Sequence, residues 1–299
     1  MLKVENVTRY YGDFKAVDDL SFEVKKGEIF GLLGVNGAGK TTTFRMMVGL
    51  LEPTNGNITI DEKEVSYDIT DEIGFLTEER SLLTKLTVKE QVIYYGILKN
   101  LDKKTILGRL DYWLQRFDIV GYKERKIKEL SKGNQQKIQF ITAIINEPKL
   151  LILDEPFTGL DPINVELFMS VIKEFEKKGS MIIFSSHRME HVELFCEKLV
   201  ILKDGRSVLS GYLKDIKKSY RKKNIFIKAN ASLAELEKIK GVTKVTVNNK
   251  RFLVTIEDES YIEEVFKYVL GCKNVTEFLV EEPSLNEIFI AKVGEKYDK

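Results

Sequence analysis

Hydrophobic and polar positions follow two different periods along the chain. Up to about residue 80, short apolar runs with strand character are separated by turn signals such as Thr54-Asn55-Gly56. The strands predicted there are Leu2 to Val7, Leu20 to Val24, Glu28 to Leu33 and Ile58 to Ile60. From Thr87, whose spacing to Glu90 fits a capping box, the period becomes helical and continues with breaks to Asn146. We therefore predict a β-rich N-terminal part followed by a helical subdomain at about 82–147.

Strand and helix patterns alternate after residue 150. The predicted elements are strands at Leu150 to Leu153, Met181 to Ser185 and Leu199 to Leu202, and helices at Pro162 to Lys177 and Arg188 to Phe195. A hairpin turn is predicted at Asp204-Gly205. This alternation is typical of an α/β fold, in which helices cover a parallel sheet.

The C-terminal part shows a different order of elements. From Asn224 onward the pattern predicts strand, helix, strand, strand, helix, strand and a closing helix after Pro283. This order favours a small α+β, ferredoxin-like domain at 224–299. The preceding segment, 216–223, is the end of a run with six basic residues and one acidic residue, so we interpret it as a linker after a first domain at 1–215. A solvated connector is the favoured reading of this run, and contact with anionic lipid or an acidic partner stays open.

Composition narrows the class of protein. The 47 basic and 46 acidic side chains nearly cancel, so the charge balance does not indicate nucleic acid as a partner. No apolar run approaches the roughly 18 residues needed to cross a bilayer. The N-terminus reads directly into a strand and lacks a signal-peptide pattern, so we expect a cytoplasmic protein. Cys196 and Cys272 lack the paired spacing of a metal site.

A glycine-rich loop carries the first chemical signal. Gly34-Val-Asn-Gly-Ala-Gly-Lys40-Thr41 fits the phosphate-loop pattern, in which backbone N–H groups surround phosphates. A predicted strand enters the loop, and a predicted helix, Thr42 to Val48, leaves it. Unpaired amides and the helix dipole converge at such a junction, so we predict a nucleotide phosphate site.

Two further motifs follow in order, Leu130-Ser-Lys-Gly-Asn-Gln135 and Leu150-Leu-Ile-Leu-Asp-Glu155-Pro156. With the glycine-rich loop, they make residues 1 to about 215 resemble the ATP-binding subunit of ABC transporters. The tail and the signature are similar to single-cassette bacterial exporters, including drug and sodium export ATPases. The resemblance implies a P-loop NTPase core with an antiparallel β-subdomain and a helical subdomain. It also implies ATP and Mg²⁺ as cofactors, a homodimer or heterodimer of ATPase subunits, and a separate integral membrane subunit.

The resemblance assigns expected roles to individual residues. Catalysis would involve Glu155, which orients the attacking water, with His187 and Lys40. Mg²⁺ would be held by Thr41, Asp154 and Glu78. The nucleotide-binding residues would be Tyr11, Gly34, Asn36, Gly37, Ala38, Gly39, Lys40, Thr41 and Thr42. The signature residues Ser131, Gly133, Asn134 and Gln135 would face the ATP of the partner subunit, and Asp161 would lie in the D-loop between the two halves.

Some positions depart from the family pattern. Lys132 and Asn134 replace usual signature residues, and Glu78 stands where glutamine is usual, with Glu79 as the alternative register. Arg80 could offset the added charge of Glu78. Tyr10 is the alternative to Tyr11 for stacking on adenine. His191 is interpreted as structural.

Other functions remain to be weighed. A soluble ABC-type ATPase acting on ribosomes or DNA is disfavoured, because the chain has one loop motif, no sustained heptads and no basic bias. A P-loop kinase or GTPase would leave the Leu130 motif unexplained. An ATP-binding module without hydrolysis is opposed by Glu155 and His187.

Overall fold

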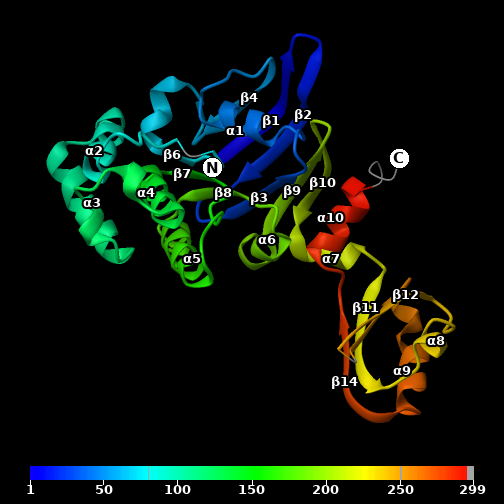
Figure 1. The fold of residues 1–299 in the computed structure, drawn as a ribbon. Helices are drawn as coiled ribbons and strands as arrows, with labels where there is room; N and C mark the ends of the chain where they lie inside the picture. Colours follow the sequence, from blue (N-terminus) through cyan, green and yellow to red (C-terminus); the bar gives the residue numbers. More distant parts are fainter. Residues whose placement is uncertain (80, 250, 295–299) are drawn as a thin grey trace. The chain divides into compact units, whose positions relative to one another are not determined.

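The chain divides into two compact units. The computed structural model describes residues 1–79, 81–249 and 251–294 (Figure 1). The first unit is Met1–Ser210 and the second begins at Gly211, so the division falls before the predicted boundary at 215. Arg80, the residue predicted to offset Glu78, lies outside the described residues.

A six-stranded sheet in the order β10-β9-β3-β8-β7-β6 forms the centre of the first unit. Its strands are β3 (Ile29–Gly34), β6 (Ile73–Leu76), β7 (Leu150–Asp154), β8 (Met181–Ser185), β9 (Lys198–Lys203) and β10 (Arg206–Tyr212). The pairings from β6 to β9 are parallel, and β7 and β8 are buried along their whole length. This explains their uninterrupted apolar runs, because both faces of a parallel sheet are covered. The carboxyl ends of β3, β7 and β8 therefore lie at one edge.

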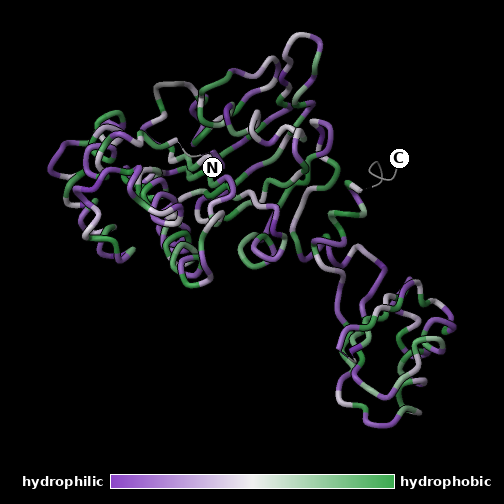
Figure 2. Tube along the Cα trace, viewed as in Figure 1, coloured by the Kyte–Doolittle hydropathy of each residue, from purple (hydrophilic) through white to green (hydrophobic). Residues whose placement is uncertain are grey.

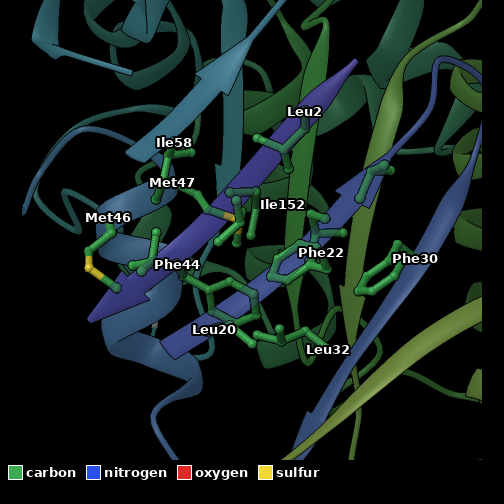
Figure 3. Close-up of a cluster of buried hydrophobic side chains, with 14 of the residues drawn as sticks. Leu2, Leu20, Phe22, Phe30, Leu32, Phe44, Met46, Met47, Ile58 and Ile152 are labelled. Atoms are coloured by element: carbon green, nitrogen blue, oxygen red, sulfur yellow. The ribbon is translucent and has the colours of Figure 1, made fainter. Parts of the chain in front are cut away.

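A second, antiparallel sheet has the order β2-β1-β4-β5. It consists of β1 (Leu2–Tyr11), β2 (Phe14–Val24), β4 (Asn55–Ile60) and β5 (Lys63–Glu64). The two sheets share one core with helix α1 (Lys40–Met47), whose Phe44 and Met47 point into it (Figure 3). The stacked rings of Phe22 and Phe30, 4.9 Å apart, join β2 to β3. This core fixes the loop between β3 and α1.

The helical subdomain lies between β6 and β7 in sequence. It contains α2 (Val88–Leu98), α3 (Lys103–Arg116) and α4 (Lys132–Ile144), with short 3₁₀ turns at Val120–Tyr122 and Ile127–Glu129. Another 3₁₀ turn, Tyr67–Glu72, precedes β6. The predicted capping box is confirmed: the Thr87 hydroxyl accepts from the Glu90 N–H, and the Glu90 carboxylate accepts from the Thr87 N–H. Helices α5 (Pro162–Lys177) and α6 (Met189–Phe195) complete the unit.

The second unit has a ferredoxin-like arrangement. Its elements are α7 (Leu213–Ser219), β11 (Lys223–Asn230), α8 (Leu233–Leu236), β12 (Val242–Asn248), β13 (Arg251–Ile256), a 3₁₀ turn at Glu259–Tyr261, α9 (Ile262–Leu270), β14 (Lys273–Glu281) and α10 (Leu285–Val293). The sheet order β12-β13-β11-β14 is antiparallel throughout. Ile225, Ile227, Val254 and Val265 belong to its own core. The predicted α+β class of this part is therefore confirmed.

The predicted linker at 216–223 differs from the structure. Leu213–Ser219 is helix α7, and strand β11 already begins at Lys223. Leu213 and Ile216 are buried, whereas Lys214 and Lys218 are exposed. The two apolar residues are three positions apart and share one helix face, which the high density of charge concealed.

Hydropathy changes over short intervals along both units (Figure 2). Within the described residues, no helix has the length and apolar character required to span a bilayer.

Candidate nucleotide site

The loop between β3 and α1 has the backbone of an anion site. Gly39 adopts a φ of 103°, and a Cβ at this position would lie 2.6 Å from the Ala16 carbonyl oxygen, so only glycine fits. Among the described residues, no side chain caps the N-terminus of α1. Asn36 and Gly37 are exposed and Ala38 is buried beneath them. The first N–H groups of α1 can therefore point to a bound phosphate.

Lys40 begins helix α1 and turns back onto the loop. Its ammonium group donates to the Gly34 carbonyl oxygen at 2.6 Å and to the Val35 carbonyl oxygen at 3.2 Å. Burial lowers the pKa of Lys40, and the carboxylates of Asp154, Glu155 and Glu78 oppose that shift. Carboxylates that are far from Lys40 in sequence thus favour the charged form of its ammonium group.

Asp154 ends strand β7 opposite Ser185, which ends β8. The Ser185 hydroxyl donates to Asp154 Oδ1 at 2.5 Å, and both residues are buried. Burial raises the pKa of Asp154, and the bond from Ser185 partly offsets that increase. Ser185 was not predicted as a site residue, since only the register between β7 and β8 makes it a partner of Asp154.

Glu155 and His187 form the closest polar pair of functional interest. The His187 N–H donates to Glu155 Oε1 at 2.6 Å, and His187 Nδ1 lies 2.8 Å from Glu155 Oε2. Glu155 has a φ of 51°, in the left-handed region that glutamate rarely adopts, and its carboxylate is mostly buried. Burial raises its pKa and His187 opposes the shift. The His187 side chain is itself 74% exposed, so its other edge is available to a ligand.

The second histidine is placed differently. His191 on α6 lies edge-on to the Phe157 ring, with centroids 4.9 Å apart. Burial lowers its pKa, which disfavours the charged form in this aromatic surrounding. Its environment is that of a packed side chain.

The predicted metal ligands offer only oxygen donors. Thr41 and Glu78 are exposed, and Asp154 is at the edge where β7 ends. In the part of the chain that the structure describes, no group of three or more His, Cys, Asp or Glu residues could hold a metal ion alone. A hydroxyl and one or two carboxylates suit Mg²⁺, which completes its octahedron with phosphate oxygens and water. The residues present therefore fit Mg²⁺ bound together with a nucleotide.

The signature residues lie at the N-terminus of α4. The Ser131 hydroxyl caps the helix by accepting from the Asn134 N–H at 3.3 Å. Gln135 Nε2 donates to the carbonyl oxygens of Ile127 and Leu130 at 3.1 and 3.2 Å. A Cβ at Gly133 would lie 3.6 Å from the Gly159 carbonyl oxygen, so the signature is close to the predicted D-loop.

Asp161 of that loop serves as the N-cap of α5. Its carboxylate accepts from the Asn164 N–H at 2.9 Å and from the Asn164 amide at 2.6 Å. These bonds lower the pKa of Asp161, which stays ionised as a cap.

Tyr11 ends strand β1 and is 44% exposed. The Arg9 guanidinium lies 5.3 Å from its ring centroid, whereas the neighbouring Tyr10 ring faces the Lys15 ammonium at 5.2 Å. A cation thus lies over each ring, and the difference between the two is exposure: Tyr11 is exposed and Tyr10 is half-buried. The more exposed Tyr11 ring offers more surface for base stacking.

The fold and this site define a P-loop ATPase. Comparison with known proteins gives the family. A family model for the ABC transporter matches residues 17–158, and a model for the C-terminal domain of DrrA1-3-like ATP-binding proteins matches residues 211–293. The ABC transporter ATP-binding protein YhaQ of Bacillus subtilis is 47% identical over 300 residues, covering 100% of both chains.

Two further relatives and two solved structures indicate the same family. NatA of B. subtilis is 34% identical over 75% of this chain and 95% of its own, and the linearmycin resistance protein LnrL is 30% identical over 98% of each. A structure of an ABC transporter ATP-binding subunit shares 31% identity with a TM-score of 0.70, covering 74% of this chain and 93% of its own. The dimeric cassette MJ0796 in a post-hydrolysis state with ADP and Pi shares 27% identity with a TM-score of 0.65, covering 71% and 99%.

The chain belongs to the ABC transporter ATP-binding proteins. It is an ATP-binding and ATP-hydrolysing subunit of an ABC transporter, and members of this family dimerise and act with membrane subunits. The alternative of a soluble ATPase acting on ribosomes or DNA finds no support among these relatives.

Proposed function

We propose that two copies of the ATPase subunit close on two molecules of Mg-ATP and drive an exporter from the cytoplasmic face of the cell membrane. The direction of transport is supported by LnrL, a linearmycin resistance protein that is similar over nearly the whole chain. The observation that carries the hydrolytic part is the Glu155–His187 pair at the edge where β7 and β8 end.

Each site residue would have a distinct task. Lys40 exchanges its bonds with the Gly34 and Val35 carbonyl oxygens for oxygens of the β- and γ-phosphates. Glu155, held by two bonds from His187, takes the proton of the attacking water, because its mostly buried carboxylate is a stronger base than an exposed one. Thr41, Asp154 and Glu78 would hold Mg²⁺, which would offset negative charge on the triphosphate when bound. The exposed imidazole edge of His187 contacts the γ-phosphate.

The other half of each site comes from the partner subunit. Ser131 and Gly133 lie at the N-terminus of α4, where N–H groups and the helix dipole favour an anion. Lys132 adds a positive charge at the same end, which is compatible with a triphosphate. Each signature helix thus faces the γ-phosphate bound by the other copy.

The membrane subunit would dock beside the helical subdomain. A cavity of about 390 Å³ opens between β6 and helices α2 and α4. Its lining includes Leu50, Phe75, Thr77, Tyr95, Leu98 and Gln139. Because this cavity borders Glu78's loop, movement of that loop can reach a docked helix.

The test replaces the general base. Glu155→Gln keeps the shape and one acceptor oxygen for His187 but removes the basic carboxylate, so we expect kcat to fall by about a hundredfold or more. ATP binding should persist, and the variant should elute as a dimer in size exclusion with Mg-ATP. The matched control is Glu190→Gln, an exposed residue on α6. A Glu155→Gln protein that stays monomeric with ATP while the wild type dimerises would count against the closed dimer.

A further inference from the structure

Two buried glutamines hold the segment that contains Glu78. Gln139 on α4 is 3% exposed and Gln91 on α2 is 0% exposed. A buried amide costs free energy unless its polar atoms find partners. Both glutamines bind the segment from Thr77 to Leu83, which connects β6 to the helical subdomain. Gln91 Nε2 also lies 3.5 Å from the Thr142 hydroxyl oxygen on α4.

Gln139 binds the backbone on both sides of Glu78. Its Nε2 donates to the Thr77 carbonyl oxygen at 2.9 Å, and it lies 3.3 Å from Thr77 Oγ1 and 3.4 Å from the Glu79 carbonyl oxygen. A single amide group therefore contacts the carbonyl oxygens of the two residues that flank Glu78. The backbone on both sides of Glu78 is thus attached to α4.

Helix α2 holds the far end of the same segment. Gln91 Oε1 accepts from the Leu83 N–H at 2.7 Å, and one turn further the Tyr95 hydroxyl donates to the Ser81 carbonyl oxygen at 3.3 Å. The described residues of the segment are thus attached to the helical subdomain, whereas β6 before them pairs with β7 of the central sheet.

The burial of Gln139 has a cost that an apolar residue would avoid. Its Oε1 is buried and finds no hydrogen-bond partner among the described residues. An unsatisfied buried acceptor is unfavourable, so stability alone does not explain an amide here. The Nε2 group of Gln139, which donates to the backbone beside Glu78, gives a reason for an amide at this position.

Helix α4 links this attachment to the signature. The helix runs from Lys132 to Ile144, with Ser131 as its N-cap, and Gln139 lies two turns from that cap. A helix of this length moves as a rigid unit, so a displacement of Ser131 also displaces the amide that holds Thr77 and Glu79.

We propose that Gln139 is a positioning residue that couples contact of the signature with the partner's nucleotide to the placement of Glu78 in the chain's own site. This inference rests on the proposed closed dimer. Gln91 assists by fixing the other end of the segment to the same subdomain. Hydrolysis in one site thereby depends on engagement of α4 in the other.

The experiment uses Gln139→Met in the full chain. Methionine has a similar volume and lacks the donors. In the nucleotide-free protein, hydrogen–deuterium exchange should become faster in peptides covering 77–83. In steady-state hydrolysis, kcat should fall by about tenfold with the KM for ATP nearly unchanged, because the looser segment misplaces Glu78 during hydrolysis and leaves the phosphate loop that binds ATP intact. Gln115→Met, an exposed glutamine on α3, is the control and should leave both measurements as in the wild type.

A double-mutant cycle separates positioning from general damage. If Gln139 acts through Glu78, adding Gln139→Met to Glu78→Ala should not reduce kcat further. Additive losses, or a change in KM alone, would overturn the inference. If Gln139→Met does not fold, the exchange measurement is made on Gln91→Met, which removes the acceptor for the Leu83 N–H at the other end of the segment.

The two proposals fail differently. Unchanged exchange at 77–83 in both variants overturns the attachment even where the wild type hydrolyses ATP as a dimer. A wild type that never dimerises with ATP refutes the closed dimer, and with it the coupling, while faster exchange would still be seen.

Discussion

Adjacent carboxylates at the end of β7 have different surroundings. Asp154 accepts from the Ser185 hydroxyl, whereas Glu155 turns through a left-handed φ and accepts from the backbone of His187. Burial raises the pKa of both. We therefore propose different roles for the two neighbours, Asp154 as a metal ligand and Glu155 as the group that takes the proton.

The pH dependence of hydrolysis tests this assignment. Burial raises the pKa of Glu155, and the charge and hydrogen bond of His187 hold it down. His187→Ala removes the imidazole, so the pKa of Glu155 should rise further. A general base acts when deprotonated, and a higher pKa moves that state to higher pH. We expect the acid limb of the kcat–pH profile of the remaining activity to shift to higher pH.

The control for this profile is Glu190→Gln, which should keep the acid limb of the wild type. An acid limb of His187→Ala at the same or lower pH would show that Glu155 is not the titrating base.

At the scale of elements, continuous apolar runs and explicit caps were the most informative patterns. The predicted bounds of α5 and β8 agree with the structure, since Pro162 and the N-cap Asp161 start α5 and an apolar run from Met181 to Phe184 forms most of β8. Strand β6 was missed, because Ile73–Leu76 is short and contains Gly74, and only pairing with β7 makes it a strand. Helix α7 was missed because lysines hid its two buried residues.

The capping box of α2 gives a stability prediction. Thr87→Ala removes the acceptor for the Glu90 N–H and should lower the free energy of unfolding by about 1 kcal/mol. Urea denaturation followed by circular dichroism measures the shift in the first unit's transition. Thr87→Ser keeps the hydroxyl and serves as control. Equal midpoints for Thr87→Ala and wild type would mean that the cap contributes nothing.

At the scale of the molecule, the two units have separate hydrophobic cores. The residues of the nucleotide site described above all belong to the first unit. We infer that this unit binds ATP without the second. The second unit would instead affect the lifetime of the dimer or the coupling of hydrolysis to the membrane subunit.

Removal of residues after Tyr212, which keeps β10 complete, tests this division. The shortened chain should bind ATP with the affinity of the full chain, measured with a fluorescent analogue. The lifetime of the Glu155→Gln dimer should change in the shortened chain. Loss of nucleotide binding in a folded shortened chain would show that the second unit completes the site.

The sequence alone determined the nucleotide loop, the order of the motifs and most elements, because backbone geometry and burial constrain residue type locally at Gly39, Asp161 and along β7 and β8. Tertiary structure alone decided which groups meet. Ser185 reaches Asp154 through strand register, and Gln139 reaches Thr77 through packing of α4 against the end of β6. Hydrogen bonds between residues distant in sequence depend on the path of the chain between them, and no local pattern records that path.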